Sequence, residues 1–227
     1  MKKIICTLLV AIAAFATYGQ FFPKTGFSIT TASSDLNFDQ GDLKEQLKAG
    51  FLVGAGYQVN FGNFAIQPEL LFIQKGSTSK YSYSGGSFSV SETTKVTLNY
   101  LELPVLFKYM MGPDALRIYL SAGPSFALGL GGKGNREYTA DFGNGPYTEK
   151  IDFKVKFEKE PEGYEGYDQY IEEKTDVGLQ FGGGLLIANK LMVDLRYGLG
   201  FTEYNKDSQV SSKNRAIQVS IGFLIGN

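Results

Sequence analysis

The chain contains no histidine and no tryptophan among its 227 residues, and its only cysteine is Cys6. Without histidine, neither a Ser-His-Asp triad nor a His-bearing zinc site can form. A single cysteine forms no intramolecular disulfide and no thiolate metal cluster. These absences remove the commonest hydrolytic and metal-dependent chemistries, and we expect a protein that is not an enzyme and carries no cofactor.

An excess of charge of one sign is also lacking, since 22 Lys and Arg stand against 23 Asp and Glu. Such a balance argues against a nucleic-acid partner. No stretch reaches the 18 or so apolar residues that a transmembrane helix needs. The hydrophobic content of 43% nevertheless excludes a disordered chain, and the length suits one domain.

The first residues have the organisation of a secretory signal peptide. Lys2 and Lys3 precede an apolar stretch at 4–15, which is too short to span a bilayer. The small residues Thr17 and Gly19 suit a cleavage site. We therefore predict that residues 1–19 are removed, Cys6 with them, and that residues 20–227 form one exported barrel domain.

Apolar and polar residues alternate with a period of two through most of the chain. This pattern predicts eight strands, at 24–33, 50–61, 64–78, 97–110, 116–130, 176–188, 190–204 and 215–225. The best helical candidate, 39–49, is short. Long loops, among them 79–96 and about 131–174, alternate with tight turns along the chain. The order predicts an all-β, eight-stranded antiparallel up-and-down transmembrane β-barrel with short periplasmic turns, long extracellular loops and both termini in the periplasm.

The two faces of these strands differ in a way that indicates the solvent. One face is bulky, apolar and uncharged, whereas the other consists of small and neutral residues with a few balanced charges. The charged residues on the second face are Glu69, Glu102, Lys108, Arg117, Asp194 and Arg196. A water-exposed surface carries more charge than this, so we expect the apolar face to contact lipid.

An eight-stranded barrel encloses just enough space for its own side chains. The six inward charges are therefore expected to form a paired network that closes the lumen. One alternative is a small passive channel lined by Glu69, Glu102, Arg117 and Arg196. A second alternative is a soluble periplasmic ligand-binding barrel, which the uncharged bulky face disfavours.

Two loops hold candidate binding residues. Asp35, Asn37, Asp39 and Asp42 offer oxygen ligands at spacings that suit Ca²⁺, but the EF-hand pattern fails, and a solvated polar loop is the favoured interpretation.

The loop at about 131–174 carries eleven acids and seven bases, and the alternation at 151–157 predicts a strand above the membrane. Its tyrosines Tyr138, Tyr147, Tyr164, Tyr167 and Tyr170 offer contact surface for a protein or glycan partner. The alternative is a polar cap that shields the barrel mouth and contacts lipopolysaccharide.

Several stretches resemble a known family when read in order. They are PELLFIQKG (68–76), NYLELPVLFKY (99–109), SAGPSFALGLG (121–131), GLQFGGGL (178–185) and LRYGLGF (195–201). Together they resemble the PorT-like outer-membrane β-barrel family common in Bacteroidota. The resemblance implies an eight-stranded outer-membrane barrel, and some members are linked to the secretion of surface proteins. The chain departs from many such barrels by continuing past Phe223 to a non-aromatic end.

The sequence as a whole predicts a monomeric, non-enzymatic protein of the bacterial outer membrane. Its lumen is expected to be polar and closed, and its partners are outer-membrane lipid, lipopolysaccharide and a protein or glycan at the extracellular loops. It is expected to act as a surface, scaffold or binding protein through those loops.

Overall fold

The computed structural model describes residues 19–34, 42–86, 88–202 and 212–226. The strands are β1 (Gly19–Ser34), β2 (Asp42–Gln46), β3 (Lys48–Phe61), β4 (Phe64–Gly85), β5 (Phe88–Met111), β6 (Leu116–Asp141), β7 (Pro146–Lys156), β8 (Gln169–Tyr170), β9 (Thr175–Ile187), β10 (Leu191–Gly200) and β11 (Ser212–Phe223). None of the described residues belongs to a helix that is long and apolar enough to cross a membrane.

Eight of these strands form a closed antiparallel ring in the order β1-β3-β4-β5-β6-β9-β10-β11. β11 pairs back onto β1 from Lys24 opposite Gly222 to Ser34 opposite Ser212, which closes the ring. The predicted eight-stranded up-and-down barrel is therefore confirmed. Short connections at 62–63, 112–115 and 188–190 lie at one end of the barrel, called the turn end below. Gly62 has a φ of +63°, which a two-residue hairpin turn favours.

The opposite end, called the hairpin end, differs from the prediction. β4 and β5 pair as far as Gly85 opposite Phe88, and β6 and β7 pair as far as Asp141 opposite Pro146. The predicted loop at 79–96 is therefore wrong, and much of the predicted loop at 131–174 is strand. Segment 79–96 is rich in Ser and Thr, which a strand exposed to water can carry as well as a loop can.

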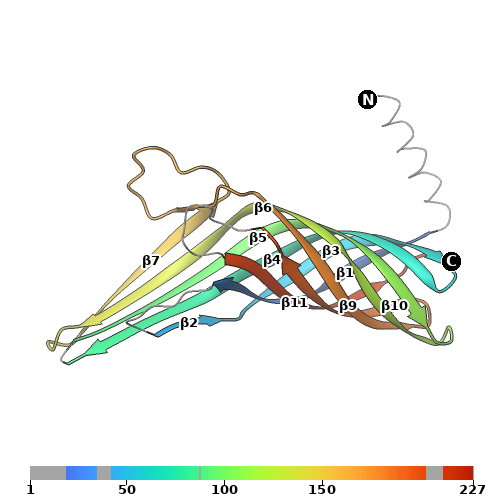
Figure 1. Ribbon diagram of the computed structural model, residues 1–227, viewed down its shortest axis with the longest axis horizontal. Helices are drawn as coiled ribbons and strands as arrows, with labels where there is room; N and C mark the ends of the chain where they lie inside the picture. The colour runs from blue at the N-terminus through green and yellow to red at the C-terminus, as the bar shows by residue number, and fades with distance from the viewer. Residues whose placement is uncertain (1–18, 35–41, 87, 203–211, 227) are drawn as a thin grey trace.

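These long strands form an extension that we call the projecting sheet: β2, β7, and residues 77–85 of β4, 88–97 of β5 and 132–141 of β6. Figure 1 shows it reaching far past the rest of the barrel, away from the turn end and the start of β1. The segment with helical potential contains β2, which pairs with β4. The strand predicted above the membrane is present as β7.

The outward face of the ring is a belt of bulky apolar side chains. Leu120, Leu195 and Phe223 are among them, with exposed fractions of 60%, 58% and 49%. Similar residues lie on each strand of the ring, from Phe61 and Phe64 beside the turn end to Leu101, Phe126 and Leu130 toward the hairpin end. An uncharged apolar surface of this size is stable in lipid and not in water, so the ring spans a membrane.

The interior has three layers. An apolar cluster near the turn end comprises Phe22, Ala65, Met110, Tyr119, Leu186, Met192 and Leu224. A second apolar cluster toward the hairpin end comprises Leu52, Ile73, Leu98, Tyr100, Ala127, Phe153, Val155 and Phe157. The buried charged side chains of Lys24, Glu69, Asp194 and Arg196 lie between the two, and those of Lys75, Glu102 and Asp176 are level with the second cluster. The residues from β7 and its following loop are thus part of the interior, although they come from the segment expected to be a loop.

Candidate functional site

Four charged side chains meet in the middle of the lumen, and we call them the central charge cluster: Lys24, Glu69, Asp194 and Arg196. Arg196 donates through Nη1 and Nη2 to Glu69 Oε2 and Oε1, at 2.7 and 2.9 Å. Lys24 Nζ lies 2.6 Å from Asp194 Oδ2 and 3.1 Å from Glu69 Oε1. Bidentate Arg–carboxylate pairing of this kind is both strong and directional. All four side chains are buried, so the pairing compensates charges that water does not reach.

A second charge cluster lies closer to the hairpin end. Lys75 Nζ stands 3.2 Å from Glu102 Oε1 and 3.4 Å from Asp176 Oδ2. Asn214 donates to Asp176 at 2.7 Å. The cavity beside these groups measures about 10 Å³, which is the space of a single water molecule. The lumen is therefore filled at this level too.

The other two predicted lumen residues lie apart from both clusters. Lys108 is buried with its Nζ 3.8 Å from the centre of the Tyr119 ring, and it donates to Gln58 at 3.4 Å. The ring hydroxyl of Tyr119 donates in turn to Asp194 at 2.6 Å, which links Lys108 indirectly to the central charge cluster. Arg117 stands at the turn end, where it pairs with Asp114 of the β5–β6 turn.

Lys24, Lys75 and Asp176 belong to the lumen network and were missed by the sequence reasoning. Each is buried and occupies the inward parity of its strand. Lys75 follows Glu69 by six residues on β4, so the alternation alone could have identified it. Lys24 and Asp176 were assigned to the first positions of predicted strands, where alternation gives little support. With them, four buried acids face four buried bases.

The charged side chains of the lumen pair with one another. The central charge cluster lies between the two apolar clusters, and the cavity beside the second charge cluster has the space of about one water molecule. Buried, mutually paired carboxylates and ammonium groups hold the strands of the ring together across the lumen. Accessible polar groups lie on the projecting sheet and its loops, and around a cavity of about 390 Å³ at the turn end, which Gln58, Arg117 and Asn189 help to line.

The five predicted recognition tyrosines divide into two groups. Tyr138 and Tyr147 lie on β6 and β7 of the projecting sheet, on the same face, and Tyr147 is 61% exposed. Tyr164 and Tyr170 pack edge to face with their ring centres 5.2 Å apart. Tyr167, between them, is 67% exposed. Tyr147 and Tyr167 are therefore the most accessible, while Tyr164 and Tyr170 help to hold the loop that follows β7.

Asp168 fixes that loop to the end of β7. Its Oδ1 accepts a hydrogen bond from the Lys154 backbone N–H at 3.0 Å, and its Oδ2 pairs with Lys156 Nζ at 3.0 Å. The backbone N–H of Lys154 and the ammonium of Lys156 lower the pKa of Asp168. The loop is thus positioned against β7 and does not extend freely from it.

The tip of the projecting sheet carries aromatic residues that the sequence analysis did not select. The ring centre of Phe88 lies 6.1 Å from that of Tyr83 and 5.2 Å from that of Phe142. Phe142 is 66% exposed. These rings join the tips of the two long hairpins, β4–β5 and β6–β7. The rings are close because β4 pairs with β5 and β6 pairs with β7 in segments for which the sequence predicts loops.

The candidate calcium residues cannot be placed. Asp35, Asn37 and Asp39 lie outside the described residues, and for Asp42 the structure describes only the backbone at the start of β2. The calcium site stays a prediction.

The closed ring, the lipid-facing belt and the filled lumen together define a transmembrane β-barrel of the bacterial outer membrane. The family model of the outer membrane protein beta-barrel domain matches residues 18–205, and the chain belongs to this family. A search of the curated proteins finds no match.

Solved structures with a similar chain course include Ail of Yersinia pestis, at 12% identity and a TM-score of 0.40 over 92% of this chain and 99% of that one. Neisserial surface protein A is similar at 13% identity and a TM-score of 0.42, over 90% and 97% of the two chains. The outer membrane enzyme PagL is similar at 11% identity and a TM-score of 0.37, over 88% and 99%.

Proposed function

We propose that this protein is a non-enzymatic surface or scaffold protein that recognises a protein or glycan partner through the projecting sheet. The observation that carries the proposal is the division of the molecule into a filled ring and an accessible extension. The charges in the middle of the ring are buried and paired, whereas Phe142, Tyr147 and Tyr167 are each more than 60% exposed on the extension or its loop. Exposed aromatic residues of this kind are favourable contact groups at interfaces.

In this proposal the projecting sheet is extracellular, and the turn end and both termini face the periplasm. Outer-membrane barrels have short periplasmic turns and longer extracellular segments, which supports this orientation. The signal peptide predicted at residues 1–19 would direct export, and the barrel would act as a monomer. The PorT-like resemblance adds an association with protein secretion in a Bacteroidota-type envelope.

We expect the folded protein to be electrically silent in planar lipid bilayers. The two apolar clusters and the paired charges fill the lumen, so no continuous water path crosses it. The measurement is single-channel recording of the mature barrel, with unboiled gel mobility as the folding control. Reproducible conductance steps that change in Glu102→Gln would instead establish the passive-channel alternative.

The projecting sheet can be shortened without opening the lumen. Ser79 pairs with Thr94 and Glu137 pairs with Lys150, so residues 80–93 and 138–149 can each be replaced by an Asn-Gly turn. We expect the shortened chain to insert and fold normally, because Phe153, Val155 and Phe157 remain. Removing all of 137–172 would delete those three residues and disturb the interior.

Partner contact can be tested with a photo-crosslinking residue at Phe142 on intact cells. We expect a discrete adduct from this position, and none from the same residue placed at Lys190 at the turn end. The shortened chain should show no adduct with a crosslinker at Tyr167 if the sheet forms the partner's main contact. A barrel that gives no adduct from Phe142, Tyr147 or Tyr167 under growth conditions would contradict the proposal.

A further inference from the structure

The outward face of β5 changes its chemistry where the apolar belt ends. Leu103 and Leu101 belong to the belt, and Asn99, Thr97 and Lys95 continue the same outward row toward the hairpin end. Four residues separate Leu101 from Thr97, about 13 Å along the strand and about 10 Å in height at the usual tilt. The row therefore passes from the hydrocarbon region of the membrane into its headgroup region.

Lysines from three strands meet at this level. Lys133 of β6 pairs with Thr97 in the ladder, next to Lys95. Lys48 of β3 reaches the same place across β4: a Cβ atom at Gly76 would lie 3.1 Å from Lys48 Cδ, and Gly76 is the residue of β4 opposite Thr97. Because Gly76 has no side chain, the Lys48 side chain has room to lie over β4.

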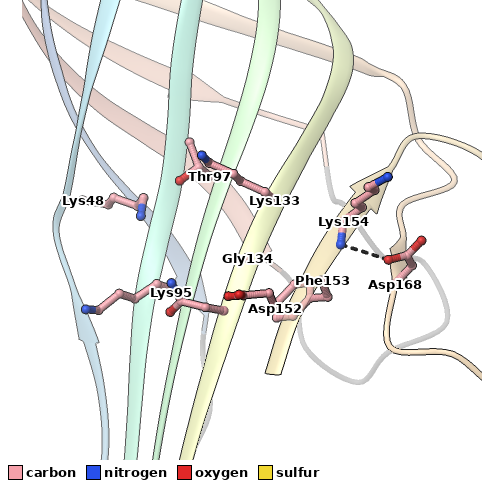
Figure 2. A pocket seen from close by; sticks show the side chains of 10 residues that line it. Lys48, Lys95, Thr97, Lys133, Gly134, Asp152, Phe153, Lys154 and Asp168 are labelled. Carbon is pink, nitrogen blue, oxygen red and sulfur yellow. Dashed lines mark hydrogen bonds between the residues drawn. The ribbon is translucent and has the colours of Figure 1, made fainter. Parts of the chain in front are cut away.

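The three lysines surround a cavity of about 590 Å³ that we call the lysine cavity. Figure 2 shows it, with Lys48 and the end of Lys95 on one side, Thr97, Lys133, Asp152 and Phe153 nearer the centre, and Lys154 and Asp168 on the other side. Lys95 and Thr97 share the outward parity of Leu101, and Lys133 is paired with Thr97, whereas Phe153 in the lining belongs to the second apolar cluster. The residues that line it come from β3, β5, β6 and β7 and from the loop that follows β7.

The lining of the cavity is net positive, with four lysines and two aspartates. Among the side chains that the structure describes, Lys48, Lys95 and Lys133 have no ion-pair partner. Asp168 is engaged with Lys154 N–H and Lys156, which leaves Asp152 as the free carboxylate of the wall. Partial burial, and then the charges of Lys95 and Lys133, lower the pKa of Lys48. An anion bound here would relieve this repulsion.

We propose that the lysine cavity binds the phosphate groups of a lipid A molecule in the outer leaflet. The position of the cavity decides the source of the phosphate. Its lysines lie beyond the exposed belt residues Leu101 and Leu128 on β5 and β6, along which the acyl chains of the same molecule would lie. Lysine stems lie readily along an apolar surface while the ammonium groups contact headgroups. The proposal does not depend on recognition by the projecting sheet.

Native mass spectrometry of the folded mature barrel in detergent tests this binding directly. The probes are phosphorylated lipid A and the same lipid A with its phosphates removed. We expect retention of the phosphorylated form to fall at least about tenfold in the variant K48Q/K95Q/K133Q. The dephosphorylated form should bind weakly to the natural and variant proteins alike.

The matched control is K159Q/K174Q/K190Q, which removes the same charge at three exposed lysines outside the cavity. This control variant should retain phosphorylated lipid A as the natural chain does. The single variant K48Q measures separately how much one partly buried lysine of the cavity contributes to that retention. Equal losses in the two triple variants would show a general charge effect and overturn the site. Equal binding of the two lipid A forms, or displacement of lipid A by millimolar inorganic phosphate, would also overturn it.

Discussion

Replacing Glu69 with alanine is expected to lower the free energy of unfolding of the barrel by about 3–5 kcal/mol. Glu69 accepts both guanidinium hydrogen bonds of Arg196 and contacts Lys24, all in the buried middle of the lumen. The substitution leaves two cations with Asp194 as their nearest carboxylate, and water cannot compensate the excess charge. Urea unfolding in lipid vesicles, followed by the shift in gel mobility between folded and unfolded forms, measures the change.

The matched control for this prediction is Glu92→Ala. Glu92 pairs with Arg136 at 3.3 Å on the projecting sheet, where both side chains are more than a third exposed. Ion pairs in contact with water contribute about 1 kcal/mol or less, so this variant should remain close to the natural chain. Similar small losses in both variants would mean that the buried cluster is not the electrostatic centre of the fold.

An arginine at Leu195 is expected to destabilise the inserted barrel by about 2–4 kcal/mol. Leu195 is 58% exposed and lies halfway between Leu191 and Leu199 on the outward face of β10, near the middle of the apolar belt. In lipid, a guanidinium at this depth loses its hydration. In a soluble barrel the same change would be nearly neutral, because the site is open to solvent.

Leu47→Arg provides the comparison for that substitution. Leu47 is 65% exposed but lies beyond the belt, between β2 and β3 at the hairpin end. We expect unfolding of this variant in vesicles to match that of the natural chain. If Leu195→Arg were equally harmless, the outward face would not contact the hydrocarbon region, and the soluble-barrel alternative would return.

The ring could be predicted from sequence because its two faces contact different media. Alternation between Leu or Phe and Gly, Ser or Gln marks each strand wherever one side contacts lipid and the other a crowded lumen. The turns at the turn end could also be predicted, because Gly62 and the segment 112–115 have the composition of turns. Strand limits at that end are close to those expected.

The projecting sheet could not be predicted in the same way because water surrounds it. Segment 79–96 carries six Ser and two Thr around Gly85 and Gly86, so its alternation is weaker than that of a membrane strand although the backbone pairing continues. The lumen network was predicted in part. Glu69, Asp194 and Arg196 do meet, but the placement of Arg117 beside Asp114 depends on the β5–β6 turn, which a residue pattern does not specify.

The central charge cluster has a consequence for how the barrel reaches its final register. Its members come from β1, β4 and β10, with 127 residues between Glu69 and Arg196, and Lys24 and Asp194 lie on either side of β11. They meet only when β11 joins β1, so dehydration of the charges and closure of the ring are one event. If the pairing of β1 with β11 shifted by one residue, the Lys24 side chain would point toward lipid. A shift of two residues would keep it inward but move it about 7 Å from its partners. The buried ion pairs therefore favour the correct register between β1 and β11, because a shifted register leaves at least one charged side chain without its partner.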